Sequence, residues 1–234
     1  MRTDYNPSHA RKGLLREAVA TLGHGLMFGF GFLPSRHKSK RAQDIHTVIF
    51  VHGLGGNRAQ FFPLQGFLRW RGYDRQYAYN YRSNDSIEAK GLELKRHLDE
   101  RIKGGRITLI AHSMGGLASR VYLQMLGGDR RVDTFITLGT PHQGSHAAAW
   151  MPTRLVSQLK PDGPFLTHLN SLPMPKDVRC VCFAASDDLM VLPGDNALGF
   201  GEEVLLNGAG HLDILFSRKV FLHIGQILDE QEPQ

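Results

Sequence analysis

The residue best placed to do chemistry is Ser113, which stands in the sequence Ala-His-Ser-Met-Gly at positions 111–115. The apolar run 107–110 precedes it, and a helix-compatible stretch, 117–126, follows it. A strand, tight turn and helix in this order, with small residues two before and two after the serine, can lift a hydroxyl clear of a sheet so that it attacks a substrate. Serines between small residues also occur in ordinary turns, so the motif alone leaves a structural turn as an equal alternative.

A serine hydroxyl needs a base within hydrogen-bond distance, and the base needs an acid that orients it. Where a serine is presented in such a turn, the acid and then the base follow it along the chain. Asp187 and Asp188 come directly after the apolar run 178–185, and His211 comes after the run 202–206 in a loop bounded by glycines. We therefore expect His211 to be the base and one of the two aspartates to be the acid.

Attack by a serine creates an oxyanion, which backbone N–H groups can stabilise. The residue after the serine, Met114, is one expected donor. The glycine-rich loop 52–56, which includes His52 and Gly53, is expected to supply the other. This loop lacks both the Gly-x-Gly-x-x-Gly pattern and the Lys-Ser/Thr of a phosphate-binding loop, so phosphate binding is the minor alternative. We expect His112 to point away from the base and to serve in packing.

Six apolar or β-branched runs predict strands, at residues 45–51, 73–81, 107–110, 132–138, 178–185 and 202–206. Helical segments separate most of them, which favours an α/β fold with a mostly parallel sheet flanked by helices. The long connection 141–177 carries apolar residues at helical spacing, so we expect short helices that form a small cap over the site. Residues 45–234 would then form the catalytic domain.

The first 44 residues are expected to form an N-terminal extension. They contain eight Lys and Arg against three acidic residues and so carry +5 of the net charge of +6. Basic and aromatic residues are not interleaved, which argues against a nucleic-acid partner. The apolar stretch 18–33 is shorter than the about 20 residues that a membrane-spanning helix needs. Residues 14–41 either pack on the catalytic domain or a second copy of the chain, or lie at a membrane surface on anionic head groups.

The chain has two cysteines, Cys180 and Cys182, within the predicted strand 178–185. Positions two apart on a strand face the same side, and this spacing is poor for a disulfide. We expect both to be small buried side chains rather than metal ligands.

Five segments taken together resemble a bacterial lipase/esterase of the α/β-hydrolase superfamily. They are His-Gly-Leu-Gly-Gly at 52–56, Ala-His-Ser-Met-Gly-Gly at 111–116, Thr-Leu-Gly-Thr-Pro-His-Gln-Gly-Ser at 137–145, Asp188, and Gly-His-Leu at 210–212. The resemblance covers residues 45–228 and implies the α/β-hydrolase fold, with six strands and a small helical cap. It also implies ester hydrolysis through an acyl-enzyme.

The resemblance assigns roles to further residues. It makes Leu54 and Met114 the donors of the oxyanion hole, and it favours Asp188 over Asp187 because the acid commonly stands three residues before a valine, here Val191. Asp213 occupies a position that binds structural calcium in some relatives, but no second aspartate matches. We therefore expect no metal and no other cofactor.

These observations predict a serine carboxylester hydrolase that acts on short-to-medium acyl esters, small or lipid. An acyltransferase or thioesterase using the same three residues remains an alternative, because the acyl-enzyme would be shared. A non-catalytic binding protein of this fold would be favoured by a missing member of the Ser–Asp–His set, and none is missing. We expect a cytoplasmic or peripherally membrane-associated protein in which deleting residues 1–40 changes association more than chemistry.

Overall fold

The computed structural model describes residues 7–32, 46–81, 85–150 and 153–231. Its centre is a six-stranded sheet in the order β2-β1-β3-β4-β5-β6, with every neighbouring pair parallel. The strands are β1 (His46–Val51), β2 (Gln76–Tyr79), β3 (Arg106–His112), β4 (Thr134–Leu138), β5 (Arg179–Ala185) and β6 (Glu202–Leu206). The predicted six-stranded α/β architecture is confirmed. The second strand is shorter than predicted, because the Tyr73 N–H closes the preceding helix on Leu68 O.

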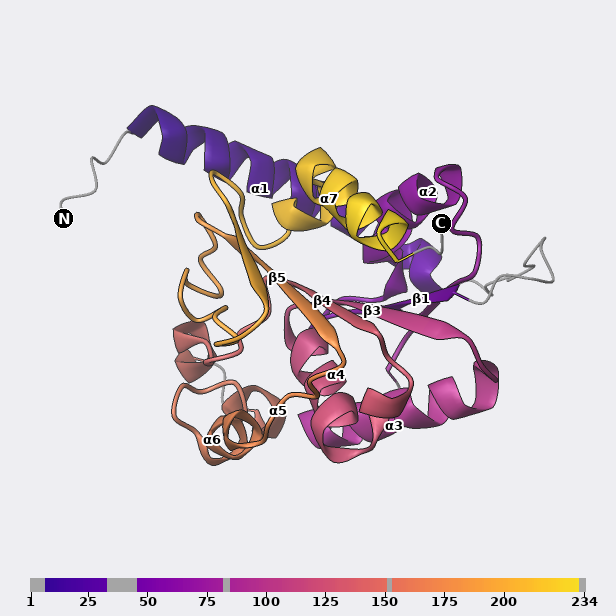
Figure 1. Ribbon diagram of the computed structural model, residues 1–234. Coiled ribbons are helices and arrows are strands. Elements are labelled where there is room, and N and C mark those ends of the chain that lie inside the picture. The colour runs from indigo at the N-terminus through magenta and orange to yellow at the C-terminus, as the bar shows by residue number, and fades with distance from the viewer. Residues whose placement is uncertain (1–6, 33–45, 82–84, 151–152, 232–234) are drawn as a thin grey trace.

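Helices cover both faces of the sheet (Figure 1). On one face lie α2 (Phe62–Trp70) and α7 (Arg218–Asp229); on the other lie α3 (Ile87–Arg101) and α4 (Met114–Met125). Strands buried on two faces read as continuous apolar runs, which is why the sequence indicated them so directly. Along β1, for example, Phe50 packs in one core and Ile49 in the other, and both are fully buried.

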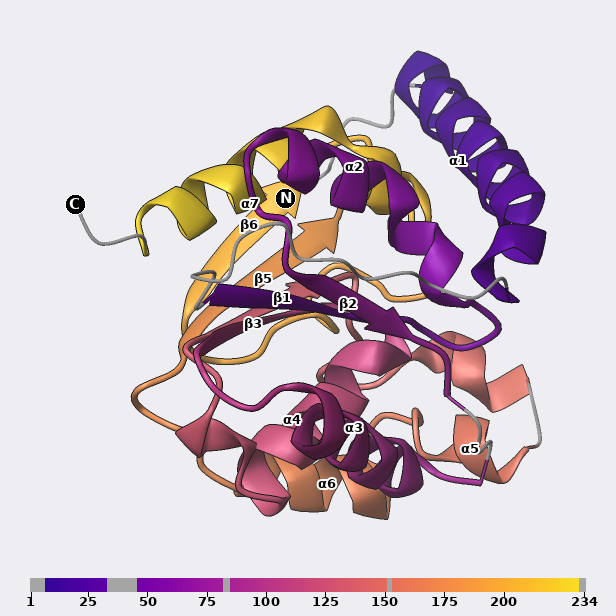
Figure 2. The ribbon, with the colours of Figure 1, turned by 90° about the vertical axis from the view of Figure 1, so that its right-hand side faces the viewer.

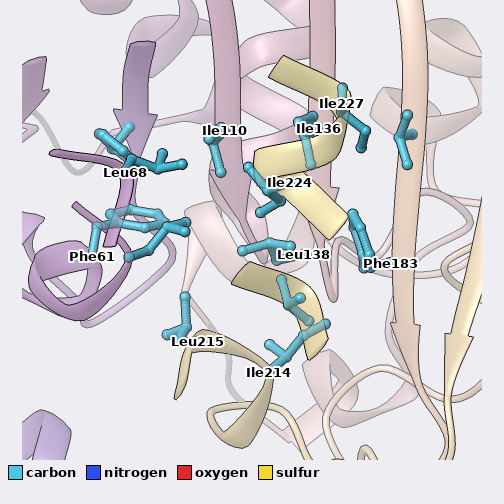
Figure 3. Close-up of a cluster of buried hydrophobic side chains, with 14 of the residues drawn as sticks. Phe61, Leu68, Ile110, Ile136, Leu138, Phe183, Ile214, Leu215, Ile224 and Ile227 are labelled. Atoms are coloured by element: carbon cyan, nitrogen blue, oxygen red, sulfur yellow. The ribbon is translucent and has the colours of Figure 1, made fainter. Parts of the chain in front are cut away.

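Helix α7 closes the core on its side of the sheet. Figure 3 shows Ile224 and Ile227 of this helix lying over Ile110, Ile136 and Phe183 of the strands. The helix begins at the N-cap Ser217, whose Oγ accepts the Val220 N–H at 3.5 Å. This helix was not among the predicted elements.

The predicted cap consists of short helices. They are the 3-10 helix η4 (His146–Trp150), α5 (Arg154–Ser157) and α6 (Pro164–Ser171). Leu155 and Leu166 pack against Leu117 and Val121 of α4, so the cap is fixed to the helix that follows Ser113.

The N-terminal helix α1 (Pro7–Phe28) lies at one end of the sheet, beside the carboxyl ends of the strands (Figure 2). It contacts the 3-10 helix η2 (Arg58–Phe61), which follows β1, and η5 (Asp213–Phe216), which follows β6. Packing on the body of the protein was one of the two expected arrangements. Among the described residues, no helix is both long and apolar enough to cross a bilayer.

Both cysteines are buried and free. Burial raises the pKa of the Cys180 thiol to about 12 and that of Cys182 to about 11, so neither forms a reactive thiolate near neutral pH.

Candidate active site

Ser113 sits in a strained turn between β3 and α4. Its backbone has φ 53° and ψ −132°, in a region that favours glycine. The Ser113 N–H donates to Leu138 O at 2.9 Å, which fixes the turn to β4. A Cβ on Gly115 would lie 2.4 Å from Val51 O, and one on Gly53 would lie 2.8 Å from the Ser113 Cβ. Close approach therefore requires glycine at both positions, and for Gly115 this is the reason that the sequence pattern indicated.

The structure brings the three widely separated residues together at the carboxyl edge of the sheet. His211 Nε2 lies 3.1 Å from Ser113 Oγ. On the other side of the ring, His211 Nδ1 lies 2.7 Å from Asp188 Oδ2. The two contacts link the hydroxyl, the imidazole and the carboxylate in one chain of hydrogen bonds.

Of the two adjacent aspartates, only Asp188 reaches the histidine. Its side chain is buried, and its Oδ1 accepts the N–H groups of Met190 and Val191, each at 2.8 Å. These bonds leave Oδ2 aimed at His211. Asp187 is exposed and accepts a hydrogen bond from Ser186 Oγ at 2.7 Å.

His112 supports the loop that carries His211. Its Nε2 donates to His211 O at 3.0 Å, and the two rings lie 4.9 Å apart. The prediction that His112 packs is consistent with its burial, but the prediction that it points away from the base is wrong. Burial, together with the nearby His211, holds the pKa of His112 well below its usual value, so it stays a neutral donor.

A second support comes from the N-terminal helix. The carboxylate of Glu17 in α1 accepts the Leu212 N–H at 2.8 Å and the Asp213 N–H at 3.0 Å. Gly210 leaves room for this approach, because a Cβ there would lie 2.3 Å from Glu17 Oε2. His112 therefore holds the carbonyl group, and Glu17 the N–H group, of the peptide bond between His211 and Leu212. Neither role was predicted from the sequence.

The glycine-rich loop after β1 lies against the serine turn. His52 Nδ1 lies 2.9 Å from Gly53 O, and the Tyr81 N–H donates to His52 Nε2 at 3.3 Å. A nitrogen facing a carbonyl must carry the proton, so the Nδ1–H tautomer is present. Burial lowers the pKa of His52 to about 4, which keeps this arrangement neutral.

A cleft of about 780 Å³ adjoins this loop. Leu54 and Met114, the two expected oxyanion donors, both line it. Its apolar wall continues through Leu155 and Val156 of the cap and Phe28 of α1. Another cavity, of about 490 Å³, lies around residues 174–180 and 200–202, where β5 and β6 begin, and so at the opposite edge of the sheet.

Asp213, the calcium candidate, begins the 3-10 helix η5. Its N–H bonds Glu17, and burial raises the pKa of its carboxyl group. Within the described ranges, no three His, Cys, Asp or Glu side chains are grouped so that they could hold a metal ion.

Comparison with known proteins places this geometry in a family context. The sequence model of the palmitoyl protein thioesterase family matches residues 47–172, which include Ser113 and the loop 52–56. A phospholipase A(1), LCAT3, from Arabidopsis thaliana is 39% identical over 74 residues, which are 30% of this chain and 17% of that protein. A triacylglycerol lipase from Pseudarthrobacter phenanthrenivorans is 30% identical over 115 residues, covering 44% of this chain and 35% of the lipase. The chain thus spans about a third or less of the length of these curated relatives.

Among solved structures, the mature lipase BlEst2 of Bacillus licheniformis superposes with a TM-score of 0.67 at 18% identity, over 84% of this chain and 94% of that one. At this identity the likeness establishes the fold. With a family model that covers more than half of its residues, the chain belongs to the palmitoyl protein thioesterase family and has the α/β-hydrolase fold of lipases and esterases.

Proposed function

We propose that the protein is a serine carboxylester hydrolase that cleaves short-to-medium acyl esters through an acyl-enzyme. The observation that carries this proposal is the pair of contacts from Ser113 Oγ to His211 Nε2 at 3.1 Å and from His211 Nδ1 to Asp188 Oδ2 at 2.7 Å. Residues 45–234 would form the catalytic domain, and residues 1–44 an extension that supports it.

In this mechanism His211 removes the proton of the Ser113 hydroxyl as the oxygen attacks the ester carbonyl carbon. The imidazolium then gives that proton to the departing alkoxide, and the acyl group remains on Ser113. Water then attacks the acyl carbonyl carbon while His211 takes its proton. The bond from that carbon to Ser113 Oγ breaks, the acid leaves, and His211 returns the proton to the serine oxygen. Asp188 stabilises the imidazolium and keeps Nδ1 protonated throughout.

The backbone N–H groups of Leu54 and Met114 would hold the oxyanion. Each such donor lowers the activation barrier by about 3 kcal/mol. Two features support them: both residues line the cleft, and Gly53 lies against Ser113. The apolar wall formed by Leu155 and Val156 suits an acyl chain, and the short cap leaves the cleft open.

A fluorophosphonate probe, which reacts with an activated serine, tests the proposal directly. We expect labelling of the wild-type protein, loss of labelling in Ser113→Ala and strong slowing in His211→Gln. Labelling that persists in Ser113→Ala would remove Ser113 from the role. A panel of p-nitrophenyl esters should show higher kcat/KM for butyrate or octanoate than for palmitate.

A second candidate is thioester hydrolysis at the same site, which the family match favours. The acyl-enzyme would be common to both reactions, and only the leaving group would differ. Comparison of kcat/KM for one acyl group carried on an alcohol and on a thiol separates the two. Product analysis with added alcohol detects acyl transfer, the remaining alternative.

A further inference from the structure

The outer face of α1 is apolar, and nothing among the described residues covers it. Leu15, Val19, Leu22 and Leu26 recur at helical spacing, and between 63% and 70% of each is exposed. Phe30, in the turn that follows, extends the row and is 59% exposed. Soluble proteins seldom leave so many large apolar side chains in one contiguous row without a partner.

The inner face of the same helix is the more polar one. Glu17 bonds the His211 loop, Arg16 donates to Gly208 O at 3.4 Å, and His24 is partly buried. Ala20 is buried against the body, and Gly23 approaches Phe216. An ordinary surface helix turns its apolar stripe inward, whereas α1 exposes its row of large apolar side chains. The described part of the protein therefore buries little of this row of apolar side chains.

We propose that this outer face docks on an anionic lipid surface. The first 44 residues carry a net charge of +5, with Arg11 and Lys12 in α1 and four more basic residues, Arg36, Lys38, Lys40 and Arg41, after it. An interfacial helix inserts apolar side chains from one face, and basic residues in its sequence and next to it attract anionic head groups. The five apolar side chains would enter the head-group region and the basic residues would meet the lipid phosphates.

A second copy of the chain is the competing occupant, because the spacing of residues 15, 19, 22 and 26 also fits a paired coiled coil. Those four positions span fewer than two heptads, whereas a coiled coil needs three or four. Pairing would also bring two segments of +5 together, which repel each other. Charge therefore favours lipid over self-association.

The position of the helix gives the docking a consequence for the site. Leu54, in the glycine-rich loop 52–56, is also exposed. So are Leu189, Met190 and Leu192, which follow Asp188 in the sequence. They lie at the carboxyl edge of the sheet, where α1 also lies (Figure 2). A lipid surface that meets α1 would approach the mouth of the cleft.

Vesicle co-sedimentation of the full chain tests the proposal. The Ser113→Ala background makes the result independent of the proposed chemistry. Vesicles of phosphatidylcholine with about one third phosphatidylglycerol should bind the protein, and pure phosphatidylcholine should bind it more weakly. Raising the salt concentration should reduce binding to the anionic vesicles. Leu22→Gln/Leu26→Gln should weaken binding at least about tenfold, because two leucines no longer enter the lipid.

The matched control is Leu92→Gln/Leu205→Gln, which changes two exposed leucines on α3 and β6 and should bind as the parent does. Circular dichroism and thermal melts check that both pairs fold. Equal binding by Leu22→Gln/Leu26→Gln and its parent overturns the proposal, as does failure of the parent to bind either vesicle. A dimer that light scattering shows to dissociate on Leu22→Gln/Leu26→Gln, without vesicle binding, assigns the face to a second copy instead.

Discussion

At the scale of single residues, the difference between two neighbouring aspartates shows how the site is specified. The Asp188 side chain is held by the Met190 and Val191 N–H groups and directs its second oxygen at His211. Asp187 is one residue away, but it faces solvent. The choice between them in the sequence rested on a resemblance to a family, and the structure gives it a physical reason.

An amide at position 188 should therefore damage the chemistry, while one at position 187 should not. In Asp188→Asn the amide group would favour the wrong histidine tautomer, and kcat should fall by about 10³–10⁴-fold with the fold intact. Asp187→Asn should retain nearly full kcat. Steady-state kinetics on a soluble butyrate ester, with melting temperatures as a folding control, makes the comparison. A larger loss in Asp187→Asn would assign the acid to that residue.

At the scale of elements, α1 is part of the support for the site through its inner face. Glu17 bonds two consecutive N–H groups directly after His211. Removing it leaves these donors without their carboxylate and frees the loop to move. This geometry argues against the expectation that the extension matters for association more than for chemistry.

Glu17→Ala should lower kcat about tenfold or more, with little change in KM, because the His211 loop would less often adopt the reactive geometry. Glu17→Gln keeps an acceptor oxygen and should be intermediate. Thr21→Ala, which removes an exposed hydrogen bond from Thr21 Oγ1 to the Glu17 backbone carbonyl but leaves the Glu17 carboxylate in place, is the matched control. The rate of fluorophosphonate labelling should follow the same order. Full kcat in Glu17→Ala, with a lowered melting temperature, would restrict Glu17 to a structural role.

The elements differ in how far the sequence could predict them. The strands were predictable because buried parallel strands are continuous apolar runs, and the positions of Ser113 and His211 followed from the ends of those runs. Glu17 was not predictable, because its partner lies 195 residues away and no local pattern marks the contact. The direction of the His112 ring likewise depends on where the His211 loop folds back. Helix α7 was within reach, since Val220, Ile224 and Ile227 have clear helical spacing.

At the scale of the whole molecule, the carboxyl edge of the sheet gathers several buried neutral histidines. His52 follows β1, His112 ends β3 and His142 follows β4. Burial lowers the pKa of His52 to about 4 and holds the pKa values of His112 and His142 well below 6.5. In the unfolded chain each would titrate near 6.5. The folded protein therefore binds fewer protons than the unfolded chain at mildly acidic pH, and the stability of the fold depends on pH.

The sign of this dependence follows from the depressed pKa values. Well above pH 6.5 the histidines are neutral in both the folded and the unfolded state, so they add no pH dependence to the free energy of unfolding. As the pH falls below 6.5 the unfolded chain takes up protons first, so the free energy of unfolding decreases until the folded-state pKa is reached. For His52 alone, with a pKa of about 4, the decrease amounts to about 3 kcal/mol across that window.

Melting temperatures should therefore be level above about pH 7 and fall steadily between about pH 6.5 and 5, before most carboxylates titrate. His142→Gln removes one of the groups that the unfolded chain protonates, so its free energy of unfolding should fall less steeply, by up to about 1.4 kcal/mol per pH unit. His168→Gln changes an exposed histidine and should keep the wild-type slope. Urea denaturation at several pH values measures these slopes. Stability that is unchanged between pH 7 and 5, or an equal slope in His142→Gln and wild type, would show that these histidines are not held neutral by the fold.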